Sequence, residues 1–166
     1  MIFNPAKYFL KRYHSPDLQP KELRRMLNLW FPFLVNRIQI ISITEDFYEM
    51  QVRLKYSFWN RNPDKSVWGG SIASALDPFF PIMMKQILLK HGIVTVFYSK
   101  AVSVEFIKMV KSNITFRFSI SKEEIVATEK ELKENGKYAG WHSVDGIDCK
   151  GKICVNGRVQ VYLRKR

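Results

Sequence analysis

A pair of glycines at the start of an apolar stretch is the first feature that could support chemistry. Gly69-Gly70-Ser71 follows a polar loop, and the residues after it favour helix because they are rich in alanine, leucine and methionine. A helix N-terminus exposes unpaired N–H groups, and glycine lets a ligand approach the backbone closely. The pattern indicates a position that could polarise a carbonyl group or hold an oxyanion. The plainer alternative is a turn.

Asp77 is the second such feature. It lies seven residues after Gly70, which is two helical turns, so a continuous helix would place both on nearly the same face. A carboxylate on an otherwise apolar face is costly to bury without a partner. Asp77 is therefore either a group that faces a ligand or an exposed residue that caps a break at Pro78. We expect Pro78 and Pro81 to kink this helix or to shorten its regular part.

The hydrophobic pattern predicts the elements that must position these residues. In the segment 48–56, every second residue is apolar, which is typical of a half-buried strand. Strands are also predicted at 37–44, 102–106, 114–120, 138–148 and 152–164, and helices at 20–31, 69–89 and 121–135. Gly157 inside the last strand indicates a bulge or a close approach. Six strands with one long helix inserted after the second predict an antiparallel α+β fold.

The first part of the chain is expected to be an extension. Residues 1–18 show no clear period, and we divide the chain into an N-terminal extension with a short helix, 1–32, and a single domain, 33–166. Apolar residues of the first ten positions lie beside Lys11 and Arg12. They predict a tail that packs on the domain or, as the alternative, one that touches a membrane surface.

Composition narrows the class of protein. The chain has 166 residues, 46% of them hydrophobic, which excludes wholesale disorder. Its two cysteines indicate a reducing compartment rather than a disulfide scaffold.

No signal peptide is evident, and the apolar stretch 72–89 is interrupted by charges and prolines, so we expect no transmembrane segment and a cytoplasmic protein. The 27 Lys and Arg against 15 Asp and Glu give a net charge of +12, which points to an anionic partner: nucleic acid, a membrane surface or a phosphorylated small molecule.

The spacing of these motifs resembles that of a known family. The matching residues are Asn60-Arg61-Asn62, Trp68-Gly69-Gly70-Ser71 and Leu76-Asp77. They resemble the Asn…His-Gly-Gly…Ala-Asp signature of hotdog-fold acyl-CoA thioesterases of the phenylacetate-pathway type. The chain is still more similar to an uncharacterised hotdog family with an Asn-Arg-Asn, Gly-Gly-Ser and Ala-Asp-Pro-Phe pattern. The resemblance covers roughly 33–166 and implies a hotdog fold, in which an antiparallel sheet of about six strands wraps around a long central helix.

The resemblance also implies roles for single residues. The N–H of Gly70 would polarise the thioester carbonyl, and Asp77 would act as general base or nucleophile, usually from the helix of a partner subunit. Asn62, or alternatively Asn60, would position water or substrate. Trp68 stands where the family has histidine, and an indole cannot accept a proton. Catalysis and binding without catalysis therefore both stay open, in a homodimer or a dimer of dimers.

The remaining expectations concern ligand binding. Trp68, Gly69 and Ser71 would contact substrate, and Lys108 and Lys111 would pair with the phosphates of coenzyme A or, alternatively, form a solvated surface. The favoured function is an acyl-CoA thioesterase, and the alternative is an acyl-CoA or lipid binder without activity. Nucleic-acid binding is less favoured because no recognition motif is present. We expect no cofactor or metal, since the three histidines are isolated in the sequence.

Overall fold

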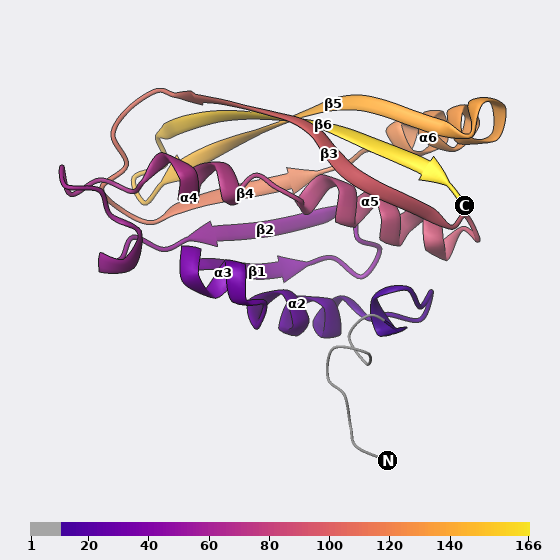
Figure 1. The fold of residues 1–166 in the computed structure, drawn as a ribbon, viewed down its shortest axis with the longest axis horizontal. Coiled ribbons are helices and arrows are strands. Elements are labelled where there is room, and N and C mark those ends of the chain that lie inside the picture. Colours follow the sequence, from indigo (N-terminus) through magenta and orange to yellow (C-terminus); the bar gives the residue numbers. More distant parts are fainter. Residues whose placement is uncertain (1–10) are drawn as a thin grey trace, which may run out of the picture.

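One antiparallel sheet wraps around a central pair of helices in the computed structural model, which describes residues 11–166 (Figure 1). Its six strands lie in the order β1-β2-β4-β5-β6-β3. The strands are β1 (Ile38–Ile43), β2 (Glu49–Leu54), β3 (Thr95–Phe106), β4 (Ile114–Ser119), β5 (Lys137–Asp148) and β6 (Ile153–Lys165). The helices are α2 (Pro20–Asn28), α3 (Phe31–Asn36), the 3-10 helix η1 (Phe58–Asn60), α4 (Gly69–Ser74), α5 (Phe79–Lys90) and α6 (Lys122–Asn135). The predicted fold class is confirmed.

The central helix is interrupted in the way that its prolines predicted. α4 ends at Ser74, and α5 begins directly after Pro78, which follows Asp77 through a cis peptide bond. Pro81, which we also expected to disturb the helix, is the third residue of α5, where its missing N–H would have had no helical partner. The stretch 69–90 is long and apolar enough to span a membrane by length and composition, but 78% of its window is buried inside the protein, as expected for a core helix.

The N-terminal helix differs from its predicted extent. α2 ends at Asn28 rather than at Phe31, and Pro32 is the second residue of the next helix, α3. Proline is accepted there because the first turn of a helix has no intrahelical use for its N–H. Leu23 and Leu27 of α2 are buried in the same core as the sheet and α5. The division of the chain after residue 32 stays a prediction, and the predicted tail before residue 11 lies outside the described residues.

α2 also closes one edge of the sheet. The side chain of Asn28 accepts a hydrogen bond from the N–H of Ile40 (2.7 Å) and donates one to the same residue's carbonyl oxygen (3.0 Å). Arg24 donates to the carbonyl oxygen of Ile41 (2.8 Å). These bonds occupy backbone groups of β1 that an edge strand would otherwise expose.

β3 forms the opposite edge and is longer than predicted, because it begins at Thr95 rather than near Val102. It pairs antiparallel with β6, with a shift of register between Ser99 and Ala101. Gly157 of β6 marks a close approach to the end of α4. A Cβ at this position would lie 2.6 Å from a methyl group of Leu76, so only glycine fits.

Candidate active site

The start of α4 is fixed by backbone hydrogen bonds to two distant segments. Val67 donates to the carbonyl oxygen of Val110 in the β3–β4 loop (2.8 Å), and Trp68 donates to that of Asn60 (2.8 Å). The carbonyl oxygen of Trp68 accepts from Ser71 (3.0 Å), which closes the first turn of the helix. The β3–β4 loop and η1 therefore hold the Trp68-Gly69-Gly70 segment at one end of the molecule (Figure 1).

The two glycines allow aromatic rings to lie directly on the backbone. A Cβ at Gly69 would lie 3.2 Å from the ring of Phe106 on β3. A Cβ at Gly70 would lie 2.4 Å from the indole of Trp68, which folds over it while staying 58% exposed. Gly69 and Gly70 are the first residues of α4, and within residues 11–166 their N–H groups donate no backbone hydrogen bond. The N–H groups of Gly69 and Gly70 are therefore available as hydrogen-bond donors next to the rings of Phe106 and Trp68.

The two candidate asparagines differ in how far their side chains are already used. Asn60 is buried; its amide nitrogen donates to the carbonyl oxygens of Asn36 (3.1 Å) and Lys55 (2.9 Å), and its oxygen accepts from Ser57 (3.0 Å). Asn62 is half-buried and its oxygen accepts from the N–H of Ser66 (3.0 Å). The amide nitrogen of Asn62 makes no hydrogen bond within the described residues, so it is the one that a ligand could reach.

Ser71 supports the site rather than facing it. Its side chain is buried, and its hydroxyl donates to the side-chain oxygen of Asn36 (2.8 Å) at the end of α3. Ser71 therefore ties α4 to α3, and its predicted contact with substrate stays a prediction. Asn36 belongs to no recognisable sequence motif and is not part of the family signature, so its contact with Ser71 was not predicted.

Asp77 lies in the segment between α4 and α5 and is half-buried. The hydroxyl of Ser99 on β3 donates a hydrogen bond to its Oδ1. Within residues 11–166 no hydrogen bond reaches Oδ2, so this oxygen is the one available to water or substrate. Sequence reasoning missed Ser99 because the predicted strand began after it.

Gly70 and Asp77 lie in different elements of the chain. α4 ends at Ser74, before Asp77, so the argument for a shared helix face holds only as far as Ser74. The expectation that Asp77 acts from the helix of a partner subunit stays a prediction.

Lys108 and Lys111 line a pocket of about 310 Å³ together with Lys150 and Lys152. It lies between the β3–β4 loop and the β5–β6 turn, next to Val110, whose carbonyl oxygen holds Val67. Lys108 is paired with Asp148 (Nζ to Oδ2, 2.7 Å). That hydrogen bond, with those from backbone N–H groups, lowers the pKa of Asp148 to about 2. No sequence motif marks Lys150 and Lys152, so only the structure brings them to this pocket.

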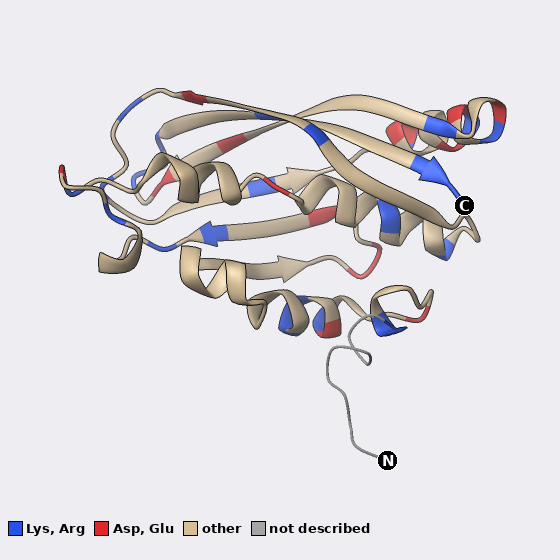
Figure 2. Cartoon of the chain, viewed as in Figure 1, with Lys and Arg blue, Asp and Glu red and all other residues tan. Residues whose placement is uncertain are grey.

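The remaining titratable groups do not form a metal site in the part of the chain that the structure describes. No group of three His, Cys, Asp or Glu side chains lies close enough there to hold a metal ion. His142 is buried, stacks near Phe80 (5.0 Å between ring centroids) and lies 3.2 Å from the hydroxyl of Tyr138. Figure 2 shows Lys and Arg on many elements rather than along one stripe, which does not favour a nucleic-acid groove.

Comparisons with known proteins identify a matching family and structures of similar fold. A family described as "Domain of unknown function (DUF4442)" matches residues 21–163, so the match includes α2, which the expected range of 33–166 left out. The search of curated proteins found no match.

Solved structures with this fold come from several bacteria. A protein of unknown function from Pseudomonas aeruginosa, described as a probable thioesterase, has a TM-score of 0.73 at 18% identity, over 89% of this chain and 97% of that one. A protein of unknown function from Chlorobaculum tepidum has a TM-score of 0.75 at 15% identity, over 92% of this chain and 100% of that one. The PaaI protein from the phenylacetic acid degradation operon of E. coli has a TM-score of 0.60 at 16% identity, over 88% of this chain and 91% of that one. At these identities the similarity shows the fold, and the predicted resemblance to hotdog thioesterases is confirmed.

Proposed function

Because the chain belongs to the DUF4442 family and has the fold of hotdog thioesterases, we propose that it is an acyl-CoA thioesterase with its site between two subunits of a homodimer. The observation that carries the proposal is the arrangement at the two ends of α4. A free N–H group lies at Gly70 at the start of the helix, and a carboxylate oriented by Ser99 lies at Asp77 after its end. A carbonyl polarised by the first and attacked with the help of the second would be hydrolysed.

The proposed reaction uses the N–H of Gly70 from one copy and Asp77 from the other. Asp77 accepts a proton from water, the resulting hydroxide attacks the thioester carbonyl, and the N–H group stabilises the oxyanion that forms. Collapse of this intermediate breaks the carbon–sulfur bond and releases the coenzyme A thiolate, which takes up the proton. The free amide nitrogen of Asn62 is the proposed contact that orients water or the thioester.

Trp68 gives the site an apolar wall in place of a histidine. Its indole covers Gly70, and the ring of Phe106 lies next to Gly69. Both rings would pack against the thioester and the first carbons of the acyl chain and exclude water from the oxyanion. Gly69 is the proposed point at which the ligand passes closest to the backbone.

The lysine pocket is the proposed site for the phosphates of coenzyme A. Lys111, Lys150 and Lys152 line it together with Lys108, whose charge is partly balanced by Asp148. Charge-assisted hydrogen bonds to phosphate oxygens are the strong kind, and Lys binds phosphate as a point charge. Because the pocket lies beside the start of α4, a ligand with its phosphates there could reach Gly70 with its thioester. The two cysteines, both free thiols, fit the proposed cytoplasmic location.

One observation favours a second function. The family histidine is replaced by Trp68, whose ring lies against Gly70, and a site closed in this way could hold an acyl-CoA without hydrolysing it. Binding without turnover would then be the function, with the same pocket for the phosphates.

The decisive experiment measures thiol release from acyl-CoA esters of increasing chain length by the purified protein. We expect turnover that Asp77→Asn abolishes and that Asp64→Asn, at an exposed loop carboxylate, leaves unchanged. Turnover that survives Asp77→Asn would exclude Asp77 as the base. Stabilisation of the fold by acyl-CoA esters without any turnover would support the binding protein instead.

A further inference from the structure

A group of large apolar side chains is exposed on the side of the molecule that carries α3. Five come from the end of α2 and from α3, and two from η1, which packs against α3. We call these seven residues the α3 patch: Leu29, Trp30, Phe31, Leu34, Val35, Phe58 and Trp59. Phe31 is 74% exposed and Trp59 is 78% exposed, so neither contributes to the core.

The spacing within α3 explains why these side chains point away from the protein. Phe31, Leu34 and Val35 lie at positions i, i+3 and i+4, which share one face of a helix. Phe33 on the opposite face is buried and packs against Phe79 of α5 (5.3 Å between ring centroids). α3 therefore places one apolar face on the core and a second apolar face in solvent, and the second needs a partner of its own.

The charges around the α3 patch are mostly positive. Segments 20–37 and 55–61, which carry the patch, contain six cations and one acidic residue. The cations are Lys21, Arg24, Arg25, Arg37, Lys55 and Arg61, and the blue segments of α2 in Figure 2 show part of this set. The acidic residue, Glu22, is paired with Arg12 (2.5 Å). The surroundings of the patch are thus cationic.

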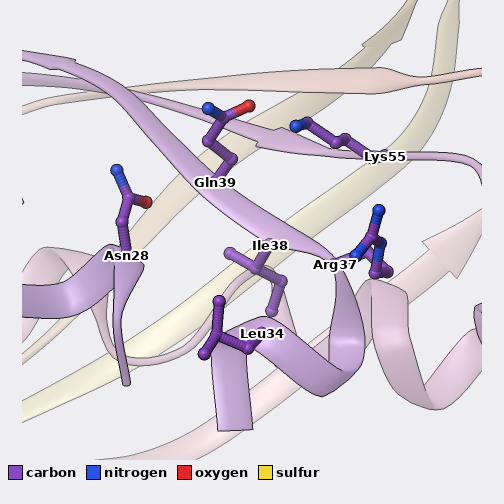
Figure 3. Close-up of a pocket in the computed structure, with 6 residues that line it drawn as sticks. All are labelled: Asn28, Leu34, Arg37, Ile38, Gln39 and Lys55. Atoms are coloured by element: carbon purple, nitrogen blue, oxygen red, sulfur yellow. The ribbon is translucent and has the colours of Figure 1, made fainter. Parts of the chain in front are cut away.

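A small pocket with two of these cations opens beside the patch. It has a volume of about 170 Å³ and is lined by Leu34, Arg37 and Lys55 among others (Figure 3). Arg37 directly follows α3 and has a left-handed backbone with φ of 62°, a conformation that glycine adopts at far lower cost. An arginine at this position supplies a guanidinium group to the pocket that glycine would not.

We propose that the α3 patch and its cationic surroundings dock the protein on the surface of an anionic lipid bilayer. Aromatic and aliphatic side chains would enter the interface between headgroups and acyl chains, and the Lys and Arg side chains would lie among the headgroups. Arg37 and Lys55 would bind a lipid phosphate in their pocket. Exposed tryptophan beside Lys and Arg is typical of surfaces that lie in this interface.

Two further observations fit a bilayer better than another copy of the chain. At the edge of β1 next to the patch, Asn28 and Arg24 already occupy backbone groups of Ile40 and Ile41, so these groups are not free to pair with a second strand. A second copy would also bring an equally cationic surface against the first. A bilayer of anionic lipids balances the charge and accepts the apolar side chains at once.

The test is co-sedimentation of the purified protein with vesicles, without any thioester present, so that it is independent of the proposed hydrolysis. We expect binding to vesicles of phosphatidylcholine mixed with phosphatidylserine and little binding to phosphatidylcholine alone. Added salt should weaken the binding. Tryptophan fluorescence should shift to shorter wavelength on binding, and Trp30→Phe with Trp59→Phe should remove most of this shift.

Two variants test the two parts of the surface. Arg37→Gly removes the guanidinium and relieves the left-handed backbone, so the fold should be kept while partitioning falls about fivefold. Phe31→Ser should lower partitioning about fivefold or more. The matched controls are Lys130→Gln and Val126→Ser, which change an exposed cation and an exposed apolar residue on α6.

Three results would overturn the proposal. They are equal binding to both kinds of vesicle, no binding to either, and equal losses in the control variants. If vesicles do not bind and Phe31→Ser lowers the mass of an assembly measured by sedimentation, the α3 patch is instead an interface between copies.

Discussion

Ser99 of β3 donates its hydroxyl hydrogen bond to the carboxylate of Asp77, which joins the edge strand of the sheet to the break between α4 and α5. The bond fixes which oxygen of Asp77 faces the sheet. It leaves Oδ2 as the oxygen that can accept a proton from water. Ser99 therefore acts through Asp77, as a positioning residue for the proposed base.

Loss of this hydroxyl should lower kcat while changing KM little. A mispositioned base weakens proton transfer in the transition state but would not weaken the proposed binding of coenzyme A at the lysine pocket. We expect Ser99→Ala to lower kcat about tenfold, against 100-fold or more for Asp77→Asn. Ser99→Thr keeps a hydroxyl on a strand that tolerates β-branched residues, so it should recover most of the activity. Steady-state kinetics with one acyl-CoA ester decides this, and equal loss in the alanine and threonine variants would contradict it.

The contact between Gly70 and Trp68 predicts a coupled pair of substitutions. In Gly70→Ala the new Cβ would lie 2.4 Å from the indole, so the exposed ring must move away. We expect a loss of about 1–2 kcal/mol in the free energy of unfolding. Trp68→Ala should remove this penalty, so that adding Gly70→Ala to it costs little, in a double-mutant cycle measured by denaturant unfolding. Additive losses would show that the ring does not press on Gly70.

The lysine pocket predicts how coenzyme A binding depends on charge. Lys150→Gln and Lys152→Gln should each weaken the binding of free coenzyme A about fivefold, and added salt should reduce the difference from the unmodified protein. Asp148→Asn should tighten binding, because it releases Lys108 from its ion pair. Lys130→Gln on α6 serves as the control. Calorimetric titration with coenzyme A checks all four variants, and tighter binding by Lys150→Gln would remove the pocket from the proposal.

Much of the fold could be predicted because its signals are local. β2 and β4 each bury one face, so their apolar residues alternate, and Ser121 with Glu124 forms the capping box that starts α6. Pro78 marked the break in the central helix. These features depend on neighbours in the sequence, and periodicity or a short motif is enough to find them.

What could not be predicted depends on contacts between distant segments. Asn28 pairs with β1 through a side chain, and nothing in the sequence around it marks that partner. Ser99 is found only when β3 crosses the α4–α5 break, and Asn36 only when α3 meets Ser71. The resemblance supplied Gly70 and Asp77, but the end of α4 at Ser74, between the two residues, required the structure.

Lys85 of α5 predicts a pH dependence of stability that is independent of the active site. Its side chain is buried, with Nζ 2.9 Å from Nδ1 of His14 and 4.2 Å from the ring centroid of Tyr13. Burial, with a smaller contribution from the charge of Arg166, lowers the pKa of Lys85 to about 8. A lysine in an unfolded chain keeps its proton up to about pH 10.4. Between these values the unfolded chain binds more protons, so stability should rise with pH through this window.

Below about pH 8 both states hold the proton, and the folded state carries the full cost of the buried charge, on the order of 3 kcal/mol. Lys85→Met removes the charge and should make the protein more stable at neutral pH by about 1–3 kcal/mol, even after the loss of the contact with His14. The difference should shrink towards about pH 10, where the wild-type amine is neutral in the folded protein. Burial raises the pKa of Tyr13, which contacts Lys85, so its phenol keeps its proton in the folded protein across this window. Denaturant unfolding at several pH values measures this difference in stability, with Lys130→Met as the exposed control. If Lys85→Met were less stable than the wild type at neutral pH and its stability had the same pH dependence, burial of the Lys85 charge would not be destabilising.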